Sequence, residues 1–448
     1  MSKHRRTSRL PDPVARIDVE SLGHDGRGVT HLGGKAVFVD GALPGETVAI
    51  DYLATHRNYD EARVRTVHEP SPNRVEPRCP HFGVCGGCSL QHLEAGEQIR
   101  AKQQVLLDNL SRIGRVMPEE VLPPLRGPVW GYRGKARLGI KDVIKKGRVL
   151  VGFREKRSSY LADLTRCEVL HPSVGEQIPA IAALIAGLKA RSRIPQVEVA
   201  VSDKFTALVF RHLDVLTGSD LEKLKLFARE QGFHVYLQPS GPDSVTPLWP
   251  EDSTLSYALP TQGIELVFKP TDFTQINSSI NRQMVECVLQ LLEPDESHRV
   301  LDLFCGLGNF TLPLARRAGK VVGIEGDAGL IARATDNAIR NGVGNAAFHV
   351  ADLAVSQIES PWAGQTYERI LLDPPRSGAA AALDIVGNIR PGRVVYVSCH
   401  PGSLARDAAR LVEEFGYRLL AAGVMDMFPH TAHVESIALF AARRTGGK

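Results

Sequence analysis

Long apolar segments are scarce in this chain of 448 residues. A typical one, AIAALIAGL at 180–188, is far shorter than the roughly 20 residues that a membrane-spanning helix needs. The first residues, MSKHRRTSRLPDP, are basic and lack the apolar core of a secretory signal. We therefore expect a cytoplasmic protein, in which disulfide bonds are rare.

Cysteine is also rare, with seven residues in the whole chain, yet three of them fall within 79–88. A structural zinc site usually pairs one C-x-x-C with a second one or with histidines. This region has a single such pair and one further, distant thiol, which favours an iron–sulfur cluster held by four thiolates. The candidate ligands are Cys79, Cys85, Cys88 and Cys167. Zinc is the alternative, with His81 and His92 as competing ligands.

The composition, 43% apolar and 23% charged, is that of a soluble globular protein of two or three domains. Residues 1–70 alternate apolar and polar side chains between glycine turns, which predicts a small all-β barrel of the OB kind. Residues 71–265 mix strand and helix patterns around the cysteines. Residues 266–448 alternate strand, glycine turn and helix, which predicts a doubly wound, largely parallel sheet.

Positive charge is concentrated in one segment, although the net charge of the chain is only +4. Residues 126–166 contain twelve Lys and Arg but only three Asp and Glu. Aromatic side chains, Trp130, Tyr132, Phe153 and Tyr160, are interleaved with them. Basic side chains neutralise phosphates and aromatic faces stack on bases, so this segment is a candidate RNA-binding surface. A solvated, strand-rich surface would show the same pattern.

A nucleotide site is predicted where the strands of the C-terminal sheet end. Gly306 and Gly308, in DLFCGLGNF, allow close approach of a ligand, and Glu325 ends the next strand. A nicotinamide cofactor would suit two glycines equally well. S-adenosylmethionine is favoured because the third glycine of the dinucleotide motif is missing. Asp352 after the third strand and LLDPPRSG after the fourth strand also favour S-adenosylmethionine.

Cys399 is the candidate nucleophile, because it ends a strand and precedes a helix whose N-terminus can lower the pKa of a thiol. Pyrimidine C5 is a poor nucleophile, and addition of a thiolate at C6 would activate it. The base that removes the C5 proton is then expected at Glu435, with His430 and His433 as competitors. Ser403 is predicted to cap the helix.

Together the segments CGGCSLQH, DLFCGLGNFTLPLA, LLDPPRSG, SCHPGSLARD and FPHTAHVE resemble the bacterial RNA uracil-C5 methyltransferases, over nearly the whole chain. The resemblance implies a TRAM domain at the N-terminus, a [4Fe–4S] cluster on the four cysteines, Cys399 as nucleophile and Glu435 as base. It also implies an S-adenosylmethionine site at Gln275, Phe304, Asn309, Glu325, Asp352 and Asp373.

Within that family, the combination of a TRAM domain and a cluster implies a uridine of 23S rRNA as the target. We expect a monomer that acts on a single-stranded or flipped base. Three other readings are open at this point: methylation of another rRNA or tRNA uridine, an iron–sulfur nicotinamide oxidoreductase, and an RNA-binding module without catalysis.

Overall fold

The computed structural model describes residues 10–443 of a multidomain α/β protein. Two compact units can be distinguished. The first contains the described residues up to Lys102 together with Glu155–Ser158 and Phe428–His433, and the second contains the remainder. Within residues 10–443, no helix is both long enough and apolar enough to cross a membrane.

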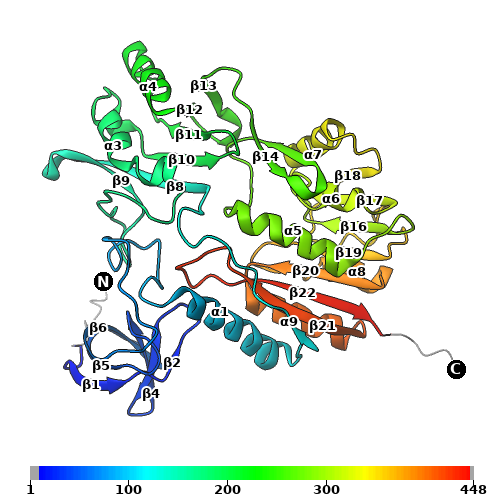
Figure 1. Cartoon of the computed structure of the whole chain (residues 1–448), viewed down its shortest axis with the longest axis horizontal. Coiled ribbons are helices and arrows are strands. Elements are labelled where there is room, and N and C mark those ends of the chain that lie inside the picture. Colours follow the sequence, from blue (N-terminus) through cyan, green and yellow to red (C-terminus); the bar gives the residue numbers. More distant parts are fainter. Residues whose placement is uncertain (1–9, 444–448) are drawn as a thin grey trace, which may run out of the picture. The chain divides into compact units, whose positions relative to one another are not determined.

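The first unit is built on a six-stranded sheet in the order β1-β5-β6-β4-β3-β2 (Figure 1). The β4–β6 pair is parallel and the other pairs are antiparallel. The strands are β1 (Val14–Asp18), β2 (Ser21–Leu22), β3 (Gly28–Leu32), β4 (Lys35–Asp40), β5 (Thr47–Thr55) and β6 (Tyr59–Glu69). The alternating sequence predicts β1, β4, β5 and β6 and misses β2 and β3, which adjoin glycine turns.

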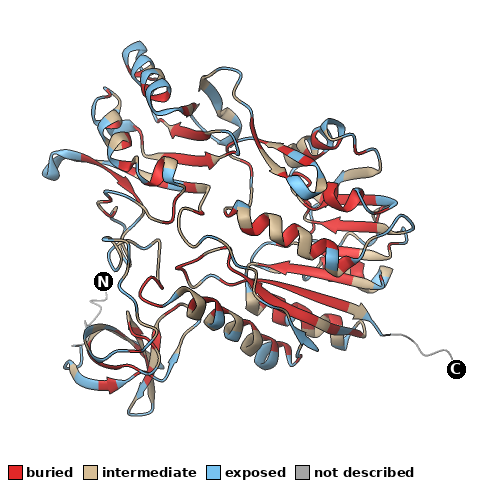
Figure 2. Cartoon of the chain, in the orientation of Figure 1, coloured by how far each residue is buried: buried red, intermediate tan, exposed pale blue. Residues whose placement is uncertain are grey.

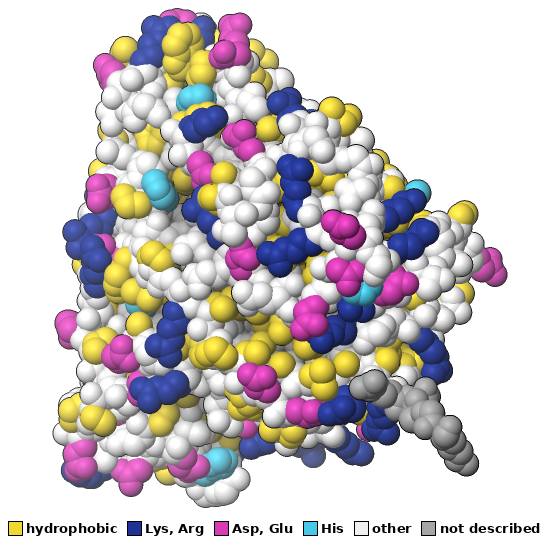
Figure 3. Space-filling model, turned by 45° about the vertical axis from the view of Figure 1, so that its right-hand side comes forward, with side chains coloured by type: hydrophobic (Ala, Val, Ile, Leu, Met, Phe, Trp, Pro, Cys, Tyr) yellow, Lys and Arg dark blue, Asp and Glu magenta, His cyan; other side chains and the backbone are white. Residues whose placement is uncertain are grey.

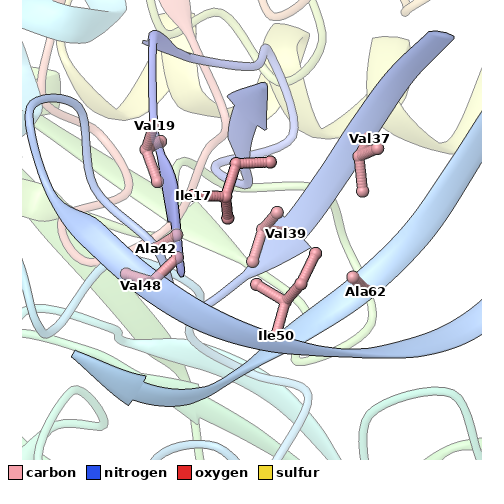
Figure 4. Close-up of a cluster of buried hydrophobic side chains, with 8 residues drawn as sticks. All are labelled: Ile17, Val19, Val37, Val39, Ala42, Val48, Ile50 and Ala62. Carbon is pink, nitrogen blue, oxygen red and sulfur yellow. The ribbon is translucent and has the colours of Figure 1, made fainter. Parts of the chain in front are cut away.

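Alternate apolar side chains of these strands meet in one core, drawn in Figure 4. Complete burial of one valine or isoleucine side chain stabilises the fold by roughly 1.5–3 kcal/mol. The cluster consists of Ile17, Val19, Val37, Val39, Ala42, Val48, Ile50 and Ala62. The turn between β4 and β5 is formed at Gly41 and Gly45, whose φ angles of 83° and 79° favour glycine.

Two segments far apart in the sequence are tied together in the first unit. Helix α1 (Ala95–Asn109) begins in this unit. The side chain of Gln98 accepts a hydrogen bond from the backbone N–H of His430 at 2.8 Å and donates to the carbonyl of Leu93 at 2.7 Å. The Phe428–His433 segment is thereby fixed to the helix, although more than 300 residues separate them.

The second unit contains a mixed sheet in the order β13-β12-β11-β10-β8-β9 and a separate hairpin, β14-β15. Their bounds are β8 (Lys135–Val143), β9 (Arg148–Gly152), β10 (Gln196–Val201), β11 (Thr206–Arg211), β12 (Phe233–Gln238), β13 (Thr246–Trp249), β14 (Leu255–Leu259) and β15 (Ile264–Phe268). The associated helices are α2 (Pro172–Gly175), α3 (Ile178–Ala186) and α4 (Gly218–Gln231). Thr217 and Asp220 form a capping box that fixes the start of α4.

An eight-stranded sheet completes the second unit, in the order β18-β17-β16-β19-β20-β22-β21-β7. Figure 2 shows its strands largely buried. The strands are β7 (Glu120–Val121), β16 (Arg299–Leu303), β17 (Lys320–Glu325), β18 (Ala346–Val350), β19 (Arg369–Leu372), β20 (Arg393–Ser398), β21 (Tyr417–Met425) and β22 (Glu435–Ala442). The helices are α5 (Ser278–Leu292), α6 (Thr311–Ala315), α7 (Ala328–Arg340), α8 (Ala382–Ile389) and α9 (Pro401–Glu413).

The strand order of this sheet reverses between β16 and β19. β16, β17 and β18 are added in one direction, and β19 and β20 in the other, all of them parallel. In doubly wound sheets, ligands bind beside such a reversal, at the carboxyl ends of the strands. β22 is the exception to the parallel arrangement, because it lies antiparallel between β20 and β21.

Candidate functional site

The turn that follows β16 is open toward the carboxyl edge of the sheet. Phe304, Gly306 and Gly308 all have positive φ angles, of 68°, 55° and 94°. A Cβ atom added to Gly306 would meet no heavy atom within 4 Å, so the space above its backbone is free. A positive φ angle is energetically unfavourable for a residue other than glycine, such as Phe304. Residues strained in this way are common at ligand-binding sites.

Three carboxylates converge behind this turn. Glu325, the last residue of β17, accepts hydrogen bonds from the backbone N–H groups of Gly306 at 3.2 Å and Gly326 at 2.7 Å. Burial raises the pKa of Asp373 to about 7, and repulsion by Glu325 adds to the effect. Burial likewise raises the pKa of Asp302 to about 7, against a hydrogen bond from Thr311.

Asp302 is the member of this acidic group that the sequence analysis misses. It lies inside β16, is fully buried, and its Oδ1 atom has no hydrogen-bond partner. A carboxylate within the apolar run VLDLF is the signal that could have identified it, since buried acids need partners. The three acids together favour a cationic ligand at this edge.

Asn309 is held by two neighbouring side chains. Its Oδ1 atom accepts hydrogen bonds from the Tyr257 hydroxyl at 2.8 Å and from the Asn281 amide at 3.0 Å, and its own amide donates to Asn281 at 2.9 Å. One N–H of Asn309 is left for a further acceptor. Gln275 and Asn281 both line a cavity of about 300 Å³ beside it.

Asp352 differs from the other predicted cofactor residues in its surroundings. It lies two residues beyond the end of β18 and is exposed. Its Oδ1 atom accepts a hydrogen bond from the backbone N–H of Ala354 at 2.9 Å, which is a local turn contact.

Cys399 and Glu435 are brought together by strand pairing. β20 ends at Ser398, which lies opposite Ser436 in the antiparallel β22. Cys399 directly follows β20, and Glu435 is the first residue of β22, so each is one residue from this pair. Glu435 is 9% exposed. The electrostatic influence of Glu435 on Cys399 is consistent with this closeness.

The protonation of Cys399 is the reverse of the sequence-based expectation. Burial, followed by the charges of Glu435 and Asp373, raises the pKa of Cys399 to about 11, against the opposite effect of Arg376. At neutral pH the group is therefore the thiol.

The predicted cap of α9 is also wrong. The helix begins at Pro401, and the side chain of His400 accepts the hydrogen bond from the backbone N–H of Ser403 at 3.1 Å. Ser403 instead donates its hydroxyl to the carbonyl of Arg376 at 2.6 Å. The serine therefore connects α9 to the turn after β19.

The cysteine-rich segment of the first unit contains three of the predicted cluster ligands. Between residues 10 and 443, no cysteine forms a disulfide bond. Burial raises the pKa of Cys85, and Cys79 is close enough to add to this. The Cys85 sulfur accepts a hydrogen bond from the backbone N–H of Gly87 at 3.4 Å. The fourth, Cys167, belongs to the second unit.

The thiols of this segment are ligands of the kind that hold an iron–sulfur cluster. In the described part of the chain, no three His, Cys, Asp or Glu side chains are grouped so as to hold a metal ion. His92, one of the competing zinc ligands, is 2% exposed, and burial lowers its pKa to about 4. Neither ring nitrogen of His92 has a hydrogen-bond partner.

The positive charge of residues 126–166 is partly offset in the structure. Acidic residues from outside the segment pair with it: Glu198 with Arg137 at 2.8 Å and Asp40 with Lys156 at 3.3 Å. Figure 3 shows Lys and Arg side chains interspersed with Asp and Glu on the face it presents. The local excess of charge is therefore smaller than the sequence suggests.

Comparison with known proteins identifies two family models. Residues 177–443, more than half of the chain, match the tRNA (uracil-5-)-methyltransferase model, and residues 13–64 match the TRAM domain. A 23S rRNA (uracil(1939)-C(5))-methyltransferase RlmD from Methylococcus capsulatus is 56% identical over 97% of this chain and 99% of its own length. An RlmD from Xanthomonas euvesicatoria pv. vesicatoria is 54% identical over 98% and 100%.

A solved structure has the same fold at lower identity. The tRNA (uracil-54, C5)-methyltransferase of Pyrococcus abyssi, in complex with S-adenosyl-L-homocysteine, superimposes with a TM-score of 0.74 at 24% identity. The match covers 95% of this chain and 99% of that one. At this level of identity the likeness concerns the fold alone.

Proposed function

We propose, because the chain belongs to the tRNA (uracil-5-)-methyltransferase family, that it transfers a methyl group from S-adenosylmethionine to C5 of a uridine in 23S rRNA. The relatives that are 53–56% identical are named for uracil 1939, and we propose the equivalent position here. The observation that carries the proposal is the pairing of β20 with β22, which sets Cys399 beside Glu435 at the carboxyl edge.

The two residues would share the work of covalent catalysis. Cys399 would give its proton to solvent and add to C6 of the uracil as the thiolate, so that negative charge reaches C5. S-adenosylmethionine, when bound, supplies the electrophilic methyl group that C5 takes up, with S-adenosylhomocysteine as the leaving group. Glu435 then takes the proton from C5, and the C6–S bond breaks to release the methylated base and the Cys399 thiolate, which regains its proton from solvent.

The cofactor residues would be Gln275, Phe304, Asn309, Glu325, Asp352 and Asp373. The free space above Gly306 supports a ligand at the β16 turn. The raised pKa of Asp373 supports a cationic partner, because a positive charge beside it would offset the cost of burying its own charge. The spare N–H of Asn309 supports a ligand with an acceptor atom.

We further propose that residues 1–70, the TRAM-containing part, form an OB-like RNA-binding barrel and that residues 71–265 form the iron–sulfur domain. Residues 266–448 would be the catalytic domain of a monomer. Cys79, Cys85, Cys88 and Cys167 would hold a [4Fe–4S] cluster, and none of the four is in a disulfide bond. No step of the reaction passes through the cluster.

The proposal is tested with an RNA stem-loop that carries 5-fluorouridine at the target position. Fluorine cannot leave as the C5 proton does, so the enzyme should remain covalently attached to the RNA when S-adenosylmethionine is present. Denaturing gel electrophoresis should show this adduct with the natural protein and lose it with Cys399→Ala. An adduct of undiminished yield with Cys399→Ala would contradict the proposal.

A further inference from the structure

The second unit contains a cavity that is lined in part by Gln275, a proposed cofactor residue, and in part by polar side chains to which the reaction assigns no role. Its volume is about 300 Å³. Lys135, the first residue of β8, and Asn277, which precedes α5, both line it, as does Gln275. The backbone N–H of Gly134 donates to the carbonyl of Ile276 at 2.8 Å, which fixes the two walls together.

Two buried hydrogen-bond donors in these walls have no acceptor. Lys135 Nζ and Asn277 Nδ2 are both shielded from solvent and without a hydrogen-bond partner. Asn277 is 1% exposed, and its Oδ1 atom caps α5 by accepting a hydrogen bond from the backbone N–H of Ile280 at 3.3 Å. This contact fixes the amide so that its NH2 group is the unpaired end.

The acidic groups around Lys135 are already engaged. Asp203 lines the same cavity, while Glu198 and Asp272 lie close enough to influence the ammonium group electrostatically. Each of the three is paired with an arginine: Asp203 with Arg282 at 3.1 Å, Glu198 with Arg137 at 2.8 Å and Asp272 with Arg333 at 2.5 Å. A buried donor without an acceptor is costly, and more so when it is charged.

We propose that this cavity is an oxyanion site, in which Lys135 and Asn277 donate hydrogen bonds to one anionic group of a ligand. This inference rests on the proposed function, which offers two sources of such a group: a phosphate of the RNA strand, or the carboxylate of S-adenosylmethionine. Both present several acceptor oxygens, and the volume holds either group with its neighbouring atoms. The combination of an ammonium group and a rigid amide favours an anion over a neutral carbonyl.

Two substitutions test the site, with a third as control. Lys135→Met removes the charge. Asn277→Asp keeps the oxygen that caps α5 but replaces the NH2 group by an oxygen that repels an anion. Lys320→Met, at the exposed start of β17, removes the same charge away from the cavity.

Dissociation constants are measured for S-adenosylmethionine, its decarboxylated analogue and an RNA stem-loop containing the target uridine. If the carboxylate is the ligand, both cavity variants should bind S-adenosylmethionine about tenfold to hundredfold more weakly and leave the decarboxylated analogue unaffected. If a phosphate is the ligand, the same loss should appear for RNA, and Lys135→Met should reduce the slope of log K against log salt by about 1. Lys320→Met should change neither the binding of S-adenosylmethionine nor the binding of RNA.

The melting temperature of the ligand-free protein distinguishes anion binding by Lys135 and Asn277 from a merely structural role of these side chains. Lys135→Met should not lower it, because the substitution removes an unpaired buried charge. Unchanged binding of all three ligands by both cavity variants, or weaker binding together with a lower melting temperature, would overturn the inference. Failure of the natural protein to bind either S-adenosylmethionine or RNA would instead overturn the proposed function.

Discussion

At the residue scale, the reactive sulfur lies among negative charges. Burial, Glu435 and Asp373 together raise the pKa of Cys399 to about 11, so that few molecules contain the thiolate at neutral pH.

This environment predicts slow alkylation of Cys399 that accelerates with pH. Because the thiolate is the reactive form, the rate with iodoacetamide should rise about tenfold per pH unit from 7 to 9, without a plateau below pH 10. Peptide mass spectrometry measures it. Glu435→Gln removes a negative charge and should speed alkylation at pH 8, whereas a plateau near pH 8 in the natural protein would contradict the argument.

The buried carboxyl of Asp302 predicts a pH-dependent stability. Its pKa is raised to about 7 in the folded protein and lies near 3.9 in the unfolded chain. Between these values the folded state binds more protons, so the free energy of unfolding should fall as pH rises from 4 to 7.

Asp302→Asn should remove this penalty and stabilise the ligand-free protein at pH 8 by about 2–4 kcal/mol. At pH 4, where both side chains are neutral, the difference should be small. Urea unfolding at the two pH values measures the change in the free energy of unfolding. An equal change at pH 4 and pH 8 would contradict a raised pKa for Asp302.

At the element scale, the strands of the catalytic sheet are predictable and their long-range pairing is not. The apolar runs and glycine turns that define β16, β17, β19 and β20 are local patterns. By contrast, the position of Glu435 beside Cys399 depends on β22 entering antiparallel next to β20. Chemistry suggests the pair, but only the register shows that Glu435, the first residue of β22, lies next to the end of β20, which Cys399 follows.

The hairpin β14-β15 contributes to the site through Tyr257, which no local pattern marks. Its hydroxyl donates to Asn309, and Tyr257→Phe removes that hydrogen bond while keeping the ring. We expect the KM for S-adenosylmethionine to rise about twofold to tenfold, with kcat within twofold, because Asn309 loses orientation rather than contact. Steady-state kinetics measure both; a fall in kcat with an unchanged KM would contradict this role.

At the scale of the whole molecule, the sequence predicts the order of the parts better than their local chemistry. It indicates an N-terminal β unit and a C-terminal α/β sheet, because the spacing of apolar residues and the turn residues can be recognised within short stretches of sequence. It does not reveal the buried Asp302, the cap at His400 or the raised pKa of Cys399. These depend on which charges and strands the fold brings together.

The cysteine segment predicts a metal content that can be measured. Protein purified without oxygen should contain about four iron and four inorganic sulfide per chain. Single serine substitutions at Cys79, Cys85, Cys88 or Cys167 should each lower both, whereas Cys287→Ser, outside the set, should not. Stoichiometric zinc without sulfide would contradict the cluster.

The most direct test of the covalent mechanism is the mass of Glu435→Gln after incubation with S-adenosylmethionine and an unmodified RNA stem-loop. Without the base that removes the C5 proton, the reaction should stop after methyl transfer, and intact mass spectrometry should show protein joined to RNA plus one methyl group. The double variant Cys399→Ala, Glu435→Gln should show none. Free 5-methyluridine formed by Glu435→Gln at the natural rate, or the same adduct in the double variant, would contradict the mechanism.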